Sequence, residues 1–541
     1  MSRTHRSARV AVLEAPADFD EQLYTALRTS PWWMISIAFH VLLFVLSALL
    51  QGTPPAVAAA PDRLLRATDP IEQKPDLDDP EGPDEVEGLV VDDLVTRESH
   101  VVDPLPIEDK DRIDNDDDLH DDPYFGAGEV GTARLDGPST NSTLGLGGGA
   151  GGGKWGLGSG RWSRSGTGRT HTQKQDEAVD HALRWLAAHQ SPDGSWEAAG
   201  WQRWADGKPA ANVDLTGQGK AQYDVGVTGL ALLAFLGAGH THRSDDAFGP
   251  VVARGLRSLK NVQDAEGCFG ARASSHYVYD HAIASLAMVE AYGMTYASTL
   301  KGPAQKGLEF LALARNPYGA WRYGIKPGDN DTSVTGWTMM ALKSARLVNA
   351  SDAARGRSPS FAIDEDAFDG IRSWIDRMTD PDSGRVGYQQ RGSGPARTPE
   401  RVDAFPAERS ESMTAVGVLA RVFLGENPAT SKPIASGVRL CRARLPTWNT
   451  SDGSLDMYYW YYATLAMFQV GGDAWHAWDG AMKSAMVDTQ RTDGDYAAYK
   501  GSWDPLDVWG ADGGRVYSTA VLALCLEVYY RYDRVFTGSG H

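Results

Sequence analysis

The sequence predicts an all-α protein in which six helix pairs close into a single (α/α)6 toroid, preceded by a transmembrane helix and a long linker. Three observations support this fold class. An uncharged apolar run near the N-terminus is long enough to cross a bilayer. An acidic and then glycine-rich stretch follows, with too few apolar residues to form a core. The rest of the chain alternates amphipathic and wholly apolar helical segments.

Residues 31–51 are expected to form a transmembrane helix that anchors the protein in the lipid bilayer. The run matches the hydrocarbon thickness, and Trp32 and Trp33 suit the interfacial aromatic belt. An uncleaved anchor is favoured over a signal peptide because the run is long and starts late. Arginines in residues 1–30 favour a cytoplasmic N-terminal segment. We therefore expect a single-pass protein of the inner cell membrane with an extracytoplasmic, periplasmic C-terminal domain.

Two polar residues, Ser36 and His40, lie four positions apart in this run and therefore on one helical face. Polar groups inside a bilayer are costly and often functional. The S-x-x-x-H pattern, followed by an acidic spacer with prolines, resembles the anchor of TonB-type proteins. This resemblance implies a motor-type partner in the inner membrane. Plain anchoring is the simpler interpretation, and both stay open at this point.

Residues 52–170 are expected to form a disordered linker that is acidic first and glycine-rich later. Residues 61–130 contain 24 Asp and Glu residues but 6 Lys and Arg residues, and so account for nearly all of the net charge of −19. The remainder is close to neutral, which argues against nucleic acid as a partner. Residues 111–122 are rich in aspartate but lack the glycine and the distal glutamate of an EF-hand calcium loop.

Residues 171–541 contain the repeated helix pairs. In the first pair, residues 178–190 place apolar side chains along one stripe, whereas residues 224–237 are apolar on all sides and must be buried on all sides. The later apolar helices begin near Asp280, Asp331, Ser412, Asp456 and Val516. An open solenoid would need polar capping repeats at its ends, and none is evident. The pattern therefore predicts a closed ring with the apolar helices inside.

The turns between paired helices resemble a known repeat. The segments Gln190–Trp196, Gln490–Gly494 and Gly501–Trp503 are similar to the QW-type turns of the prenyltransferase and squalene-cyclase superfamily, also described as prenyltransferase/squalene-oxidase repeats. This resemblance covers about two thirds of the chain. It implies a single toroid with a cavity at its mouth, lined by the N-terminal ends of the inner helices.

The residues expected around this cavity combine aromatic rings with a few acids, which suits an apolar or a cationic ligand. They are Tyr223, Asp224, His276, Tyr279, Asn330, Glu411, Tyr458, Trp460 and Tyr517. The aspartates at the starts of inner helices have a second interpretation as N-caps. The sequence does not identify the physiological ligand.

The resemblance to class II terpene cyclases, which are isomerases, implies a protonating aspartate before an inner helix. With Thr332 as the reference position, the acid position holds Asn330, which has no acidic proton; a shift of one residue brings in Asp331. The candidate catalytic residues are therefore Asp331, or Asp280 beside His281.

No metal and no cofactor are expected. In the related prenyltransferases a histidine at the start of the last inner helix binds zinc, and Ser518 stands at the matching position. The sequence around Cys268 lacks the thioester run of complement-type domains, and Cys441 and Cys525 lie in apolar helical segments typical of a core.

Three functions are compatible with these residues. The first is a non-catalytic toroid that binds a ligand or a polypeptide. The alternative is an enzyme similar to squalene or terpene cyclases with a degenerate acid motif. The third is a glycan-cleaving enzyme that uses two of the carboxylates of Asp280, Asp331 and Glu411.

Overall fold

The computed structural model describes residues 173–210, 214–272, 274–317 and 319–528. The expected transmembrane helix, with Ser36 and His40, lies outside these ranges, and so do the whole linker and residues 171–172 of the toroid segment. Within the described ranges, no helix combines the length and the apolar character that a membrane span requires.

The described residues form twelve α-helices that alternate between an outer and an inner position. The outer helices are α3 (Gln173–Ala188), α5 (Gly249–Asn261), α7 (Ser298–Ala314), α9 (Asp366–Met378), α11 (Lys432–Arg442) and α13 (Gly472–Met486). The inner helices are α4 (Asp224–Gly237), α6 (Tyr277–Thr295), α8 (Thr332–Ala354), α10 (Ser412–Phe423), α12 (Met457–Val470) and α14 (Gly510–Leu526). The short elements are β1 (Trp204–Ala205), β2 (Lys208–Pro209), η2 (Trp201–Arg203), η3 (Ala221–Tyr223), η4 (Ala407–Arg409) and η5 (Val487–Thr489).

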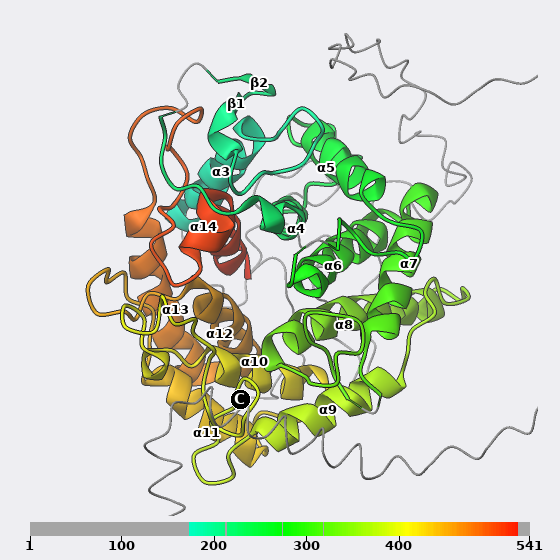
Figure 1. The fold of residues 1–541 in the computed structure, drawn as a ribbon, viewed down its shortest axis with the longest axis vertical. Coiled ribbons are helices and arrows are strands. Elements are labelled where there is room, and N and C mark those ends of the chain that lie inside the picture. Colours follow the sequence, from blue (N-terminus) through cyan, green and yellow to red (C-terminus); the bar gives the residue numbers. More distant parts are fainter. Residues whose placement is uncertain (1–172, 211–213, 273, 318, 529–541) are drawn as a thin grey trace, which may run out of the picture. The chain divides into compact units, whose positions relative to one another are not determined.

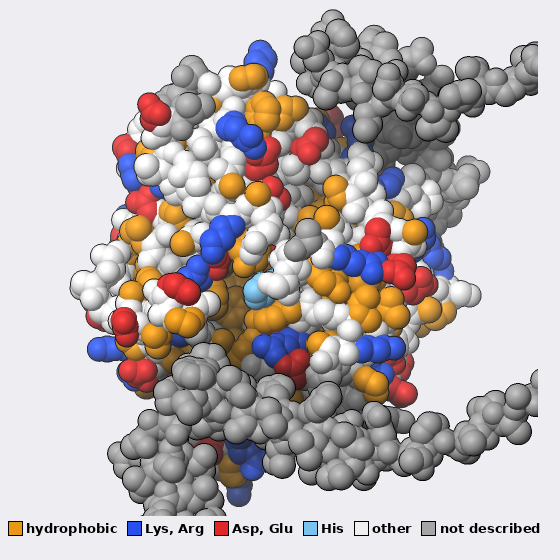
Figure 2. All heavy atoms as spheres, viewed as in Figure 1, with side chains coloured by type: hydrophobic (Ala, Val, Ile, Leu, Met, Phe, Trp, Pro, Cys, Tyr) orange, Lys and Arg blue, Asp and Glu red, His pale blue; other side chains and the backbone are white. Residues whose placement is uncertain are grey.

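The inner helices form a closed ring (Figure 1). Each packs against the next in the order α4, α6, α8, α10, α12 and α14, and α14 packs back against α4. Each outer helix covers an inner neighbour, and α3 covers both α14 and α4. Figure 2 shows a hollow near the centre of the same view, with hydrophobic side chains in its depth. The closed arrangement of inner and outer helices agrees with the expected (α/α)6 toroid.

Burial follows the pattern that the sequence predicts. Every residue from Gly226 to Gly237 in α4 is buried, whereas the outer helix α9 buries one stripe that includes Phe368, Ile371 and Ile375. Cys441 and Cys525 are buried core residues, as predicted. An apolar helix therefore occupies the inner ring because all of its faces need neighbours, while an amphipathic helix can leave one face to water.

Within the described part, five turns that precede inner helices are attached in the same way. A backbone N–H in the turn donates to a side chain near the start of the following inner helix, over 2.9–3.3 Å. The pairs are Trp196 with Thr228, Phe269 with His281, Trp321 with Thr335, Val386 with Thr414, and Trp503 with Thr519. The repeat in the sequence thus corresponds to a repeated hydrogen bond.

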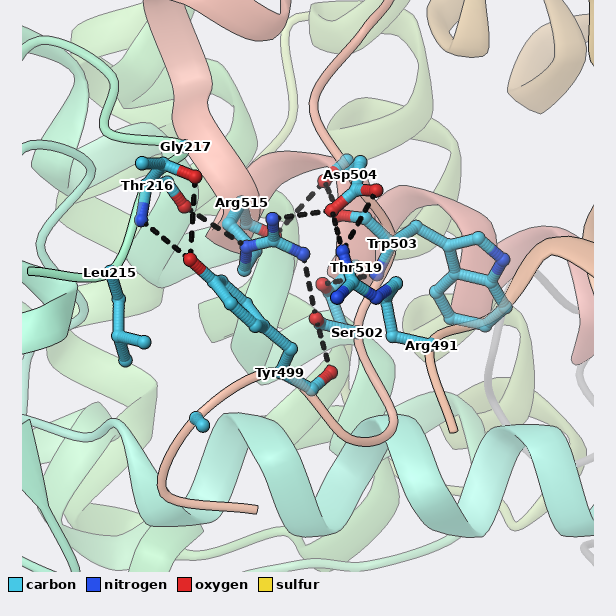
Figure 3. Close-up of polar contacts among 12 residues, drawn as sticks. Leu215, Thr216, Gly217, Arg491, Tyr499, Ser502, Trp503, Asp504, Arg515 and Thr519 are labelled. Atoms are coloured by element: carbon cyan, nitrogen blue, oxygen red, sulfur yellow. Dashed lines mark hydrogen bonds and ion pairs between the residues drawn. The ribbon is translucent and has the colours of Figure 1, made fainter. Parts of the chain in front are cut away.

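Arg515 in α14 joins the first and the last repeat (Figure 3). Its backbone N–H donates to the carbonyl of Gly217, 2.8 Å away, in the connection before α4. Its guanidinium donates to Ser502 Oγ at 2.9 Å, pairs with Asp504, and lies 4.4 Å from the centroid of the Tyr499 ring. One buried side chain therefore connects the segments on both sides of the point where the ring closes.

Candidate functional site

The starts of the inner helices lie together at one end of the ring, here called the mouth. Backbone N–H groups at or beside these starts donate to the neighbouring unit over 2.7–3.1 Å. These hydrogen bonds join Lys220 to Asp512, Met457 to Asp507, and Thr332 to Tyr388. The expectation that the helix starts surround a common opening is consistent with this geometry.

Half-buried aromatic side chains line the mouth. The ring of Tyr223 lies 6.3 Å from that of His276, which in turn lies 4.1 Å from the ring of Tyr323 in an edge-on arrangement. The hydroxyl groups of Tyr323 and Tyr388 form a hydrogen bond. Trp509, the N-cap of α14, is also half-buried. The mouth thus offers flat apolar surfaces with polar edges, which is typical of a binding site.

Deeper in the ring, five aromatic residues meet between opposite inner helices. We call this cluster the aromatic plug: Tyr279, Trp337, Tyr458, Tyr461 and Tyr462. Trp337 of α8 stacks on Tyr461 of α12 at 5.3 Å, and its Nε1 donates to the Tyr279 hydroxyl at 2.8 Å. The phenol groups of Tyr279 in α6 and Tyr458 in α12 also interact. Because α6 and α12 are opposite members of the ring, these side chains cross the lumen.

Tyr279 lies at the boundary between mouth and plug. Its side chain keeps some exposed surface, yet burial raises the pKa of its hydroxyl well above the usual value. The Tyr279 hydroxyl is therefore the buried part of the side chain, where it accepts the hydrogen bond of Trp337.

Asp331 is the N-cap of α8, and only one of its two carboxylate oxygens takes part in the cap. Oδ1 accepts hydrogen bonds from the Val334 N–H at 2.8 Å and from Ser333 Oγ at 2.7 Å. Oδ2 is buried and has no hydrogen-bond partner among the described residues. Burial raises the pKa of Asp331 to about 6. The structure therefore shows the cap and also an acid that holds its proton more tightly than usual.

Asp280 is buried on α6 against α4. Gly226 makes room for it, because a Cβ atom at position 226 would lie 2.4 Å from Asp280 Oδ1. Burial and then the nearby charge of Asp224 raise the pKa of Asp280 well above its usual range. Asp224 itself accepts the Ala198 N–H at 2.7 Å, and burial raises its pKa to about 6. These two carboxyl groups form an acidic pair near the mouth.

His281 contacts the turn before α6 and the outer helix α7. Its Nδ1 accepts the Phe269 N–H at 3.0 Å, and its Nε2 lies 3.0 Å from the Gly307 carbonyl in α7. Burial lowers its pKa to about 4. The residue occupies the position that threonine holds in the other four attached turns. Both ring nitrogens are thus engaged in holding the turn and the outer helix.

Two further residues of the expected site are engaged in turns. Glu411 is almost fully buried and forms a bidentate ion pair with Arg385. Thr414 Oγ1 donates to the Glu411 carboxylate at 2.8 Å. The side-chain oxygen of Asn330 accepts from Asn316 Nδ2 at 2.8 Å and from the backbone of Ala320 at 3.1 Å. Turn contacts therefore engage the carboxylate of Glu411 and the side-chain oxygen of Asn330.

The last two expected residues differ in their surroundings. Trp460 is buried and packs against Trp448 in the connection between α11 and α12, 6.2 Å from ring to ring. The hydroxyl of Tyr517 donates to Asp507 Oδ2 at 3.2 Å. Burial and the neighbouring Asp456 raise the pKa of Asp507 to about 7.

Sequence reasoning missed several residues of this end of the ring: Tyr323, Trp337, Tyr388, Asp507 and Trp509. Tyr323 and Tyr388 follow the glycine-containing turns, so their position relative to each turn was a usable signal. In the described ranges, no group of three or more His, Cys, Asp or Glu side chains is arranged to hold a metal ion.

Comparison with known proteins agrees with this architecture. Residues 162–379 match the family model described as the squalene-hopene cyclase C-terminal domain. The helical ring is a squalene-cyclase-like toroid. No match to the chain is found among curated proteins.

Solved structures similar to this squalene-cyclase-like toroid have unrelated activities. One is the GH76A α-1,6-mannanase of Salegentibacter, with 10% identity and a TM-score of 0.43, covering 66% of this chain and 98% of that chain. Another is the type II terpene cyclase MstE of Scytonema, with 14% identity and a TM-score of 0.40, covering 65% and 97%. These two similarities concern the fold and assign no activity to this chain.

Proposed function

We propose that the protein is a membrane-anchored, extracytoplasmic toroid that binds a ligand or a polypeptide segment at its mouth without converting it. The observation that carries this proposal is the aromatic plug. Tyr279 and Tyr458 meet across the lumen and Trp337 stacks on Tyr461 beside them, so a ligand finds a shallow aromatic site above this cluster instead of a deep reaction chamber.

The anchoring part of the proposal rests on residues 31–51, with residues 52–170 as a spacer between the bilayer and the toroid. We expect the acidic part of this spacer to be extended, because its like charges repel one another. Ser36 and His40 would face any motor-type partner in the membrane.

One experiment tests anchoring and binding together. We expect the full-length protein, fused after His541 to a reporter that is active outside the cytoplasm, to be active and to sediment with membranes. Reconstituted in liposomes, it should retain members of a peptide library or a neutral oligosaccharide, and mass spectrometry should recover them unchanged. A soluble product truncated near Gln51, or retention of none of these probes, would contradict the proposal.

A cyclase-like enzyme is the second candidate, and Asp331 favours it. Its buried Oδ2 has no partner among the described residues, and its raised pKa suits a proton donor. The glycan-cleaving alternative is weaker, because Arg385 and Thr414 already engage the carboxylate of Glu411.

Replacing Asp331 with asparagine separates these roles. Asparagine caps a helix about as well as aspartate. The folded-state pKa is about 6, whereas an unfolded aspartate titrates near 3.9. The folded protein thus loses stability as pH rises from about 4 to about 6, and Asp331→Asn, which cannot titrate, escapes this loss. Across that window its free energy of unfolding should rise by about 1–3 kcal/mol relative to the wild type.

Denaturant unfolding at a series of pH values measures this difference. A difference that stays constant would mean that the Asp331 carboxyl titrates normally. The same two proteins are incubated with squalene: we expect no cyclised product from either. Product formed by the wild type and lost at least a hundredfold in Asp331→Asn would establish the second candidate instead.

A further inference from the structure

The connection between α9 and α10 lies at the rim of the mouth. We call residues 387–406 the strap; it is drawn in yellow-green in Figure 1. At one end, Thr332 at the start of α8 donates its N–H to the Tyr388 carbonyl at 3.1 Å and its Oγ1 to the Gly387 carbonyl at 2.7 Å. At the other end, the strap reaches Asp512 at the start of α14. Between these ends the strap also contacts Asp456, the cap of α12, so it runs along one side of the rim of the mouth.

Two arginines, four positions apart, hold the far half of the strap. Arg397 Nη2 pairs with Asp456 Oδ2 at 2.9 Å, and the two side chains are 3% and 1% exposed. Arg401 Nη1 pairs with Asp512 Oδ2 at 2.6 Å. Both guanidinium groups lie near the ring of Trp509, at 5.9 and 5.5 Å from its centroid. A tryptophan flanked by two aspartates therefore forms a site that fits two guanidinium groups.

The rest of the strap is irregular in structure and largely exposed. It contains no helix and no strand, and residues 398–400 and 402–404 are exposed. Gly392 and Gly394 have φ values of 65° and 76°, a conformation that glycine adopts without strain. Because this part buries few apolar side chains, opening of the strap mainly requires that its two ion pairs exchange partners.

We propose that the strap is a displaceable occupant of the mouth, and that its site accepts an extended polypeptide segment of a partner that carries two arginines at the same spacing. This inference rests on the proposed binding function. The Asp456, Asp512 and Trp509 site recognises guanidinium groups whichever chain supplies them. Because the strap is tethered, its effective concentration is on the order of millimolar, so the partner binds only when it outcompetes the strap. The free protein is thereby autoinhibited.

A peptide made from the strap itself is the probe. Full-length protein in lipid nanodiscs is titrated into a fluorescent peptide of residues 387–406, and anisotropy reports binding. The double variant Arg397→Ala, Arg401→Ala should bind this peptide at least tenfold more tightly than the wild type, because its own strap no longer competes. A peptide in which both arginines are alanine should bind to neither protein.

Arg391→Ala is the matched control. Arg391 lies in the strap, but its Nε donates to the Arg377 carbonyl at 3.1 Å, away from the two aspartates. This variant should bind the peptide no better than the wild type.

A second variant, Asp456→Asn with Asp512→Asn, keeps the helix cap but removes both carboxylates. It should show faster amide exchange in residues 387–406 and no peptide binding. The inference is wrong if strap exchange stays slow in both double variants, or if the arginine variant binds the peptide no better than the wild type. Recovery of an unchanged ligand by the wild-type protein would still support the proposed function in that case.

Discussion

Replacing Trp337 with alanine should lower the free energy of unfolding by about 3–5 kcal/mol, the cost of emptying a tryptophan site in a packed interior. Trp337 is 2% exposed, stacks on Tyr461 at 5.3 Å and lies 5.5 Å from the Tyr462 ring. Its removal leaves the Tyr279 hydroxyl without the indole donor and opens the lumen below the mouth. Denaturant unfolding of the full-length protein measures the loss.

Two controls make this result specific to the plug. Trp337→Phe keeps an aromatic ring and loses the indole N–H, so it should cost about 1–2 kcal/mol. Added indole should raise the melting temperature of Trp337→Ala and leave that of the wild type unchanged, because a new apolar cavity binds a matching ring. A loss below about 1 kcal/mol in Trp337→Ala would show that this side chain does not fill the lumen, and the proposed shallow site would lose its main support.

Replacing Arg515 with alanine should cost about 3 kcal/mol, since it removes one partner of a buried ion pair. The Arg515 side chain is 2% exposed, and Asp504 is 28% exposed and so keeps some hydration after the change. The variant also loses the hydrogen bond to Ser502 and the stacking on Tyr499. Arg515→Lys should restore little of this stability, because an ammonium group cannot reproduce the planar guanidinium.

Arg491 provides the comparison for Arg515. It pairs with the same Asp504, but its side chain is 32% exposed, so Arg491→Ala should cost less than about 1 kcal/mol. Amide exchange should also rise in α3, α4 and α14 in Arg515→Ala, where the first and last repeats meet. Equal losses of stability in the two variants would mean that Arg515 has no special part in closing the ring.

Much of the fold follows from local patterns in the chain. The expected helix start near Asp331 corresponds to α8, which begins at Thr332 with Asp331 as its cap. The burial of Cys441 and Cys525 also follows from the apolar segments around them. Hydrophobic periodicity identifies a helix and its buried face because side chains three and four residues apart share one side.

The candidate site was predicted less completely. The aromatic residues at the helix starts were identified as a group, and Tyr279, His276 and Tyr223 do lie at the mouth. The sequence alone did not separate His281, which holds a turn, from a histidine that acts on a ligand. It also did not show that Arg385 engages Glu411, because a loop residue far from a helix start in sequence gives no sign of its partner.

The sequence by itself determined the helix pairs, their inner and outer positions and the caps Asp331 and Asp456, since these depend on side chains within a few turns of each other. The cap interpretation was wrong for Asp224 and Asp280, which lie inside the first turns of α4 and α6. Only the tertiary structure decided that Trp337 meets Tyr461 across the lumen, that Arg515 joins the two ends of the ring, and that Arg397 reaches Asp456. These contacts join residues from different repeats. Their geometry depends on how six units pack around a closed ring, and no local period in the chain records that packing.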